Sequence, residues 1–144
     1  LANLGPEPLA SDFDGNYLHR RAHGRSQAVK TLIMDSKVVV GVGNIYACEA
    51  LFRAGIQPQL AASDISHSRY LRLAECIKAV LSEAIAQGGT TFRDYVDANG
   101  NPGYFAVALA VYGREGKPCK HCGTLIQREV LAQRSTFFCR QCQH

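Results

Sequence analysis

The alternation of apolar and polar residues predicts a mainly helical protein. Apolar residues recur at three- and four-residue spacing over residues 25–34, and Ser26 is the expected N-cap of this helix. A turn-like connection is expected over residues 35–43. The next helix is expected to begin with Asn44 as its N-cap and to end with Gly55 as its C-cap. The pattern therefore indicates two helices joined by a turn-like stretch.

A third and longer helix is expected over residues 66–87, where apolar residues again follow one face. Residues 1–24 are rich in Pro, Gly, Asp and Asn, which predicts an irregular lead-in with one short helix. Residues 90–103 begin as a helical turn and become a loop, because ANGNPG contains many turn formers. Residues 104–112 fit either a helix end or a strand.

Four of the six cysteines form an ordered set near the C-terminus. CKHC is followed by CRQC, with sixteen residues between the two pairs. This is the spacing of a zinc ribbon, in which two tight knuckles supply a tetrahedron of thiolates. Because all four ligands come from the protein, the expected ion is a single structural zinc. Its predicted ligands are Cys119, Cys122, Cys139 and Cys142.

The segment between the knuckles predicts a β-hairpin, with strands near residues 124–130 and 136–139 and a tip at residues 131–135. Arg134 would be displayed at this tip, where a guanidinium can pair with phosphate or a base edge. Two disulfides and an iron site are the alternatives for the four cysteines. The remaining two, Cys48 and Cys76, lie in helical patterns and are expected to be buried as small apolar residues.

The net charge of +4 is carried entirely by residues 112–144, where six Lys and Arg stand against two acidic residues. Residues 19–37 are also locally basic. Two separated basic patches fit a polyanionic partner, with ordinary solvated surface as the alternative. No apolar run approaches the length of a membrane span, and no secretory signal is visible, so no membrane partner is expected.

The junction GVGN at residues 41–44 raises the question of which anion it binds. A helix N-terminus offers backbone N–H groups and the positive end of the helix dipole. The third glycine of the dinucleotide fingerprint is absent, and no G-K-[ST] phosphate loop is present. Lys37 lies in the same turn, and Asn44 can cap the helix or donate its amide outward. These features favour a nucleic-acid phosphate.

Several motifs occur in one order along the chain: LGPEPL, MDSKVVVGVGNIYACEALFRAGI, GGTTFRDY, GNPGYF, VYGREGKPCKHCGT and AQRSTFFCRQCQ. Together they closely resemble the bacterial formamidopyrimidine-DNA glycosylase family over essentially the whole chain. The resemblance implies a helix–two-turn–helix module over residues 1–103 and a β-hairpin zinc ribbon with four cysteine ligands over residues 104–144. It also implies a loop around residues 97–104 that covers the flipped base. The DNA-binding residues that it implies are Lys37, Gly43, Asn44, Tyr46 and Arg134.

The resemblance implies that the family's catalytic residues are not in this chain. Their nucleophile is an N-terminal proline in a β-sandwich domain, assisted by an adjacent glutamate and a more distant lysine. Pro6 and Glu7 belong instead to the interdomain motif LGPEPL. The full-length enzyme is expected to excise oxidised purines from damaged double-stranded DNA and to cleave the resulting abasic site. This chain alone is expected to be inactive. The whole protein is expected to be a monomeric, cytoplasmic and nucleoid-associated bacterial protein.

Two alternative functions are kept. The sister endonuclease for oxidised pyrimidines shares the ribbon, although GVGNIY and AQR favour the purine-specific branch. A zinc ribbon that binds another protein is the second alternative, and it predicts little salt dependence in DNA binding.

Overall fold

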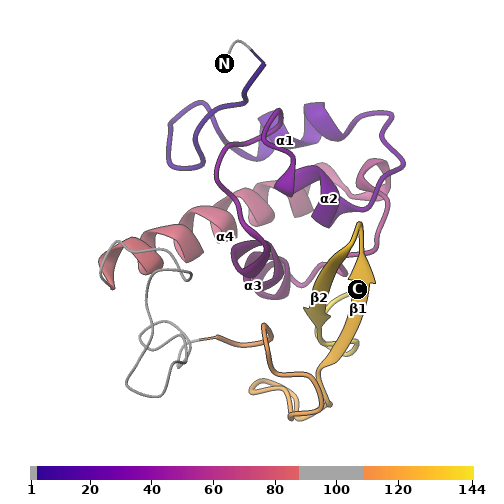
Figure 1. The fold of residues 1–144 in the computed structure, drawn as a ribbon. Coiled ribbons are helices and arrows are strands. Elements are labelled where there is room, and N and C mark those ends of the chain that lie inside the picture. The colour runs from indigo at the N-terminus through magenta and orange to yellow at the C-terminus, as the bar shows by residue number, and fades with distance from the viewer. Residues whose placement is uncertain (1–2, 88–108) are drawn as a thin grey trace.

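The structure is a computed structural model that describes residues 3–87 and 109–144. Within these residues, helices form one body and a two-stranded antiparallel hairpin lies against it (Figure 1). This confirms the mainly α fold with a C-terminal hairpin. In chain order the elements are α1 (Gly15–Ala22), α2 (Val29–Met34), α3 (Asn44–Ala54), the 3₁₀ helix η1 (Ala62–Asp64), α4 (His67–Ala86), β1 (Gln127–Leu131) and β2 (Arg134–Phe138).

The long helix α4 packs against both α1 and α3. It begins where the sequence predicts, because Ser66 is its N-cap and the Ser66 hydroxyl accepts from the Arg69 N–H. Its apolar face is buried in the main core. Gly15 lets α1 approach closely, since an added Cβ would lie 2.2 Å from the Cα of Leu71. These contacts make α4 the support for the helices that carry the site.

The helix α2 starts later than a Ser26 cap predicts. Its N-cap is Ala28, which provides no side-chain cap. The backbone N–H of Val29 instead donates to the carbonyl of Leu60 at 2.7 Å, and that of Lys30 donates to the carbonyl of Pro58 at 3.3 Å. The Ser26 prediction is therefore wrong, because contacts from a distant segment satisfy the N–H groups that a local cap would serve.

The hairpin turn is shorter than predicted. Leu131 pairs directly with Arg134, so the turn consists of Ala132 and Gln133 alone. Both have positive φ, 48° and 67°, as a two-residue turn that follows the strand twist requires. Arg134 is consequently the first residue of β2, and the predicted tip over residues 131–135 is too long.

The ribbon shares its core with α3. A second hydrophobic cluster joins residues of the ribbon to Cys48, and Phe52 of α3 packs against it. The helix also supplies Glu49, which is 2% exposed and accepts backbone N–H bonds from residues 110–112 at 2.8–2.9 Å. A segment with so few apolar residues of its own gains its burial from the helix.

Both cysteines outside the ordered set are buried, as predicted: Cys48 is 1% exposed and Cys76 is 6% exposed. In the part of the chain that the structure describes, no helix is long and apolar enough to span a bilayer. The expectations for the loop at residues 90–103, the base-covering loop at 97–104 and residues 104–108 lie outside the described residues. Residues 104–112 were expected to form a helix end or a strand. The part of this segment that the structure describes, residues 109–112, forms neither.

Candidate nucleic-acid interface

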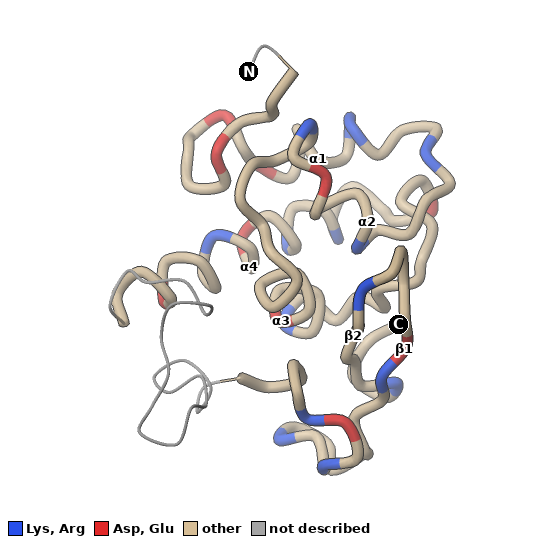
Figure 2. The backbone as a smooth tube through the Cα atoms, in the orientation of Figure 1, with Lys and Arg blue, Asp and Glu red and all other residues tan. Residues whose placement is uncertain are grey.

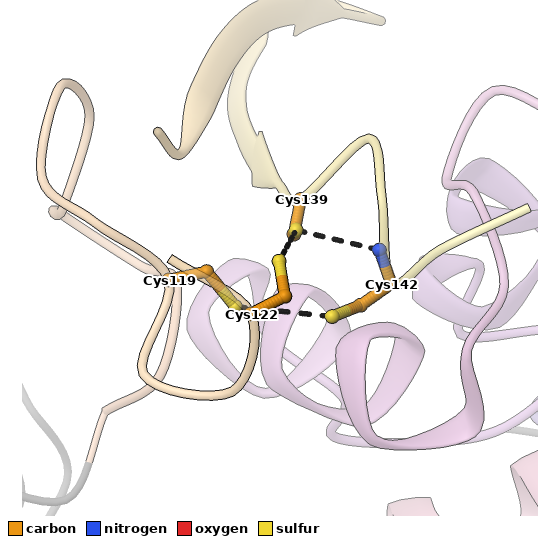
Figure 3. Close-up of side chains that lie close together, drawn as sticks. All are labelled: Cys119, Cys122, Cys139 and Cys142. Carbon is orange, nitrogen blue, oxygen red and sulfur yellow. Dashed lines mark hydrogen bonds between the residues drawn. The ribbon is translucent and has the colours of Figure 1, made fainter. Parts of the chain in front are cut away.

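The four ordered cysteines converge on one point beside the hairpin (Figure 3). All four Sγ atoms lie within 4.8 Å of one another. Two of these sulfur pairs, Cys119–Cys142 and Cys122–Cys139, are 3.9 and 3.5 Å apart. Zinc–thiolate bonds of about 2.3 Å in a tetrahedron place the sulfurs about 3.8 Å apart, so the donor set fits zinc. A disulfide needs about 2 Å between sulfurs, and the disulfide alternative is therefore wrong.

The chemistry of the thiols also suits a divalent cation. Hydrogen bonds from Thr124 lower the pKa of Cys122 to about 6, whereas burial raises the pKa of Cys139 and of Cys142. Full ionisation of the set therefore needs a cation among the sulfurs. The N–H of Cys142 points at the Cys139 sulfur at 3.4 Å, as in a knuckle that orients its ligand. With four protein ligands the zinc is structural.

The junction before α3 presents bare backbone on its outer side. Gly41 has a φ of 84°, which favours glycine, and Gly43 is the N-cap of α3 with no side-chain cap. An added Cβ at Gly43 would meet only the Tyr46 ring, at an ordinary 3.8 Å. Packing within the described residues thus places no demand for glycine at position 43. The uncapped helix end is open to an external anion.

Asn44 does not cap α3 as predicted; it is the first helical residue, and Gly43 takes the cap position. The reason lies in the ribbon, because the Asn44 Nδ2 group donates to the carbonyl of Ser135 at 2.9 Å. Its Oδ1 atom is buried without a hydrogen-bond partner among the described residues. Ser135 is next to Arg134, so the structure brings the start of α3 and the hairpin arginine together.

The two predicted cationic contacts are exposed. Lys37 lies in the turn after α2, where its N–H donates to the Asp35 carboxylate at 2.9 Å. Neither its ammonium group nor the Arg134 guanidinium makes a hydrogen bond or ion pair with another described residue. Figure 2 shows basic positions on both hairpin strands and on the helical body beside them. Tyr46, in the first turn of α3, is half-buried against the main core.

Lys30 lies next to the candidate interface, and the sequence patterns did not single it out. It is 2% exposed, burial lowers its pKa, and its Nζ donates to the Thr136 hydroxyl at 2.7 Å. The sequence did hold one sign of its burial, because Lys30 lies three residues before the apolar Ile33 and so on the same face of the helix. Lys30 borders a cavity of about 340 Å³ between α2 and the hairpin. The cavity is lined by Lys30, Thr31, Met34, Asp35, Leu131, Ala132 and Arg134.

Gln143 fastens the second knuckle to the helical body, which no pattern in the sequence predicted. Its Oε1 accepts from the Cys139 N–H at 2.8 Å, and its Nε2 donates to the Ile56 carbonyl at 2.9 Å. The N–H of His144 donates to the carbonyl of Gly55 at 3.0 Å. The ribbon is thus tied to α3 through Glu49 and, at its C-terminal end, to the turn that directly follows α3.

Comparison with known families gives two matches. Residues 4–96 match the formamidopyrimidine-DNA glycosylase H2TH domain, and residues 116–144 match a zinc finger found in FPG and IleRS. The chain is 58% identical over 143 residues to formamidopyrimidine-DNA glycosylase of Syntrophotalea carbinolica, covering 99% of this chain and 53% of the relative. It is 59% identical over 143 residues to the enzyme of Magnetococcus marinus, covering 99% of this chain and 52% of that relative.

Solved structures agree. The MutM (Fpg) protein of Thermus thermophilus matches with a TM-score of 0.87 and 43% identity, over 99% of this chain and 55% of that one. A complex of Lactococcus lactis Fpg with DNA containing Fapy-dG matches with a TM-score of 0.86 and 32% identity, over 99% and 51%.

The chain spans about half the length of the curated relatives that it matches. The helical family model covers most of that span and the zinc-finger model most of the remainder, in the order found in this structure. This chain therefore belongs to the formamidopyrimidine-DNA glycosylase family.

Proposed function

We propose that this chain is the damaged-DNA-binding, C-terminal part of a base-excision-repair glycosylase that removes oxidised purines. The observation that carries the proposal is the contact between Asn44 and Ser135, which sets the start of α3 beside Arg134. Curated relatives named for formamidopyrimidine excision match almost the whole chain, and one solved relative holds Fapy-dG DNA.

Two anion-binding elements from different modules meet at this contact. The uncapped start of α3 offers N–H groups and a positive dipole end, and the ribbon offers an exposed guanidinium at Arg134. Gripping phosphates on both sides of a lesion would hold the duplex bent while one nucleotide leaves the stack. That extrusion costs a few kcal/mol, which backbone contacts must offset.

Each predicted contact residue has a role in the proposal. Asn44 and Lys37 hold phosphates near the extruded nucleotide, and Arg134 holds the strand on the other side. Gly43 lets the DNA backbone come close, because no side chain stands there. Tyr46 lies in the first turn of α3, whose N–H groups face the phosphate.

We assign the helical DNA-binding module to residues 1–103 and the zinc ribbon to residues 104–144. The hydrogen bonds that Glu49 accepts from the N–H groups of residues 110–112, and the one that Gln143 donates to the Ile56 carbonyl, support a rigid pairing of the two. The zinc held by the four cysteines supplies structure and no chemistry. Its role is to keep β2, and with it Arg134, in place.

The chemical steps belong to a separate N-terminal domain in this proposal. There the amine of a terminal proline would attack C1′ of the sugar and displace the damaged base; opening of the sugar ring would then give an iminium, from which the two flanking phosphates are eliminated. The full protein would act as a monomer on chromosomal DNA, within the nucleoid. This chain alone would bind damaged DNA without cleaving it.

A salt titration of DNA binding tests the proposal. The zinc-loaded chain is titrated with a duplex that contains 8-oxoguanine, and log K is expected to fall linearly with log salt. Absence of affinity at low salt would overturn the proposal and favour the protein-binding ribbon. Base-release assays on the full-length protein, with 8-oxoguanine and thymine glycol compared, separate the purine-specific from the pyrimidine-specific branch.

A further inference from the structure

Two side chains of α1 hold the backbone of the turn that carries Lys37. The Tyr17 hydroxyl donates to the carbonyl of Val38, and the Arg21 Nη1 group donates to the carbonyl of Lys37 at 3.0 Å. Arg21 also donates to the Tyr17 hydroxyl oxygen at 2.8 Å, and its guanidinium lies 5.8 Å from the centre of the Tyr17 ring. Two consecutive carbonyls are therefore held by one linked pair of side chains.

The lead-in holds the same turn through backbone hydrogen bonds of its own. The N–H of Gly5 donates to the carbonyl of Ser36 at 2.9 Å, and the N–H of Val40 donates to the carbonyl of Pro6 at 3.0 Å. The approach is so close that a Cβ on Gly5 would lie 2.3 Å from the Val38 oxygen. The backbone around Lys37 is thus hydrogen-bonded to two separate segments, α1 and the lead-in, whereas the Lys37 side chain is exposed.

A held backbone matters because a cation that is already placed loses less conformational freedom on binding. The turn also leads directly into the GVGN junction and the start of α3, so its position sets both. Arg21 is half-buried, and its Nη1 group serves two protein acceptors. It is therefore suited to act through the turn and not on the DNA itself.

We propose that Tyr17 and Arg21 are positioning residues for DNA binding, which fix the turn so that Lys37 meets a phosphate beside the start of α3. The proposal rests on the proposed function, since it assumes that DNA is the ligand. It adds two residues of α1, a helix that none of the implied DNA contacts uses.

A double-mutant cycle tests the pairing of Tyr17 with Lys37. Tyr17→Phe removes one oxygen and no charge, so a loss of affinity cannot come from weaker long-range attraction. We expect Tyr17→Phe to weaken binding of an 8-oxoguanine duplex about 5-fold, and Lys37→Ala about 10-fold. In the double variant the Tyr17 change should add less than about 2-fold, because the lysine that it positions is gone.

The salt slope is the second readout. Lys37→Ala should reduce the slope of log K against log salt by about one, as loss of one phosphate contact predicts. Tyr17→Phe should reduce it in the same direction although the net charge is unchanged. A purely structural role would lower the melting temperature and leave the slope intact.

Arg20 offers a matched control for Arg21. It is the neighbouring residue on α1, exposed, and without a hydrogen bond to any described side chain or turn carbonyl. Arg21→Lys keeps the charge but loses the two hydrogen bonds that Nη1 donates to the Tyr17 hydroxyl and the Lys37 carbonyl. We therefore expect it to weaken binding about 5-fold. Arg20→Ala removes a charge but leaves the contacts of Tyr17 and Arg21 with the turn intact, and should weaken binding less than about 2-fold.

The outcomes separate the two proposals. All variants are measured with zinc bound and well below their melting temperatures, which are recorded in parallel. If the unmodified chain binds and the effects of Tyr17→Phe and Lys37→Ala multiply independently, the positioning role is overturned and the proposed function stands. If the unmodified chain shows no salt-dependent affinity for DNA, both are overturned.

Discussion

The side-chain amide of Asn44 donates a 2.9 Å hydrogen bond to the carbonyl of Ser135, 91 residues later in the chain. One residue further along β2, the Thr136 hydroxyl accepts from the buried ammonium group of Lys30 at 2.7 Å. Two side chains of the helical body thus hold consecutive positions of the strand that begins with Arg134. The relative placement of this arginine and the start of α3 is set within the protein, before any ligand arrives.

Asn44→Ala should weaken DNA binding at least about 10-fold, because it removes a donor at the helix start and the tie to the hairpin. The free energy of unfolding should fall by no more than about 1 kcal/mol, since the change also removes the unpartnered Oδ1 atom. Filter binding and chemical denaturation measure the two effects. Unchanged affinity would remove Asn44 from the interface.

Arg134→Ala should weaken DNA binding about 10-fold or more and lower the salt slope by about one. Arg140→Ala is the control, because Arg140 is another exposed ribbon arginine, within the second knuckle between Cys139 and Cys142. It removes the same charge and should change the affinity less than about 3-fold. Equal losses from the two variants would mean that only the net charge of the ribbon matters.

Zinc removal should abolish DNA binding while most helical structure remains. The ribbon has little apolar core apart from what α3 lends it, so its fold depends on the metal. The helical body has its own larger core around α4. We expect one zinc per chain by elemental analysis, and loss of affinity with retained far-UV circular dichroism after chelation. Full affinity in the zinc-free chain would contradict this dependence.

Glu49→Gln should cost about 2–3 kcal/mol of unfolding free energy. Both oxygens of the buried Glu49 carboxylate accept backbone N–H bonds, and Gln replaces one of them with an NH2 group that cannot accept. The ribbon should lose its hold on α3, and DNA affinity should fall with it. Glu75→Gln, at an exposed position on α4, is the control and should cost less than about 0.5 kcal/mol. Chemical denaturation of the two variants checks the difference.

Lys30 predicts a pH dependence of stability. Burial lowers its pKa in the folded chain, so between this pKa and the ordinary value of about 10.4 the unfolded chain binds more protons than the folded one. The stability of the parent should therefore rise relative to Lys30→Met as pH increases through that window. Below the lowered pKa the difference should be constant. If the unfolding free energy of the parent fell relative to that of Lys30→Met as pH rose from about 7 to 10, the assigned direction would be contradicted.

Several features could be predicted from the residues alone because they depend on near neighbours in the chain. Ser66 caps α4 through an N–H three residues away, and Gly55 ends α3 in the left-handed conformation. The C-x2-C pairs specify metal knuckles for the same reason, since each knuckle is a local turn. These signals were sufficient for the presence of the main helices, the ribbon and the zinc ligands, but not for the N-caps of α2 and α3.

Tertiary packing decided the details of the candidate site. The orientation of Asn44, the late start of α2 at Val29, and the burial of Lys30 and Glu49 all follow from contacts with segments far away in the chain, up to 106 residues for Lys30. No local pattern encodes such contacts. They form because a ribbon too small to bury its own backbone and apolar side chains must share a core with α3, and that shared surface turns the polar groups of both modules toward one another.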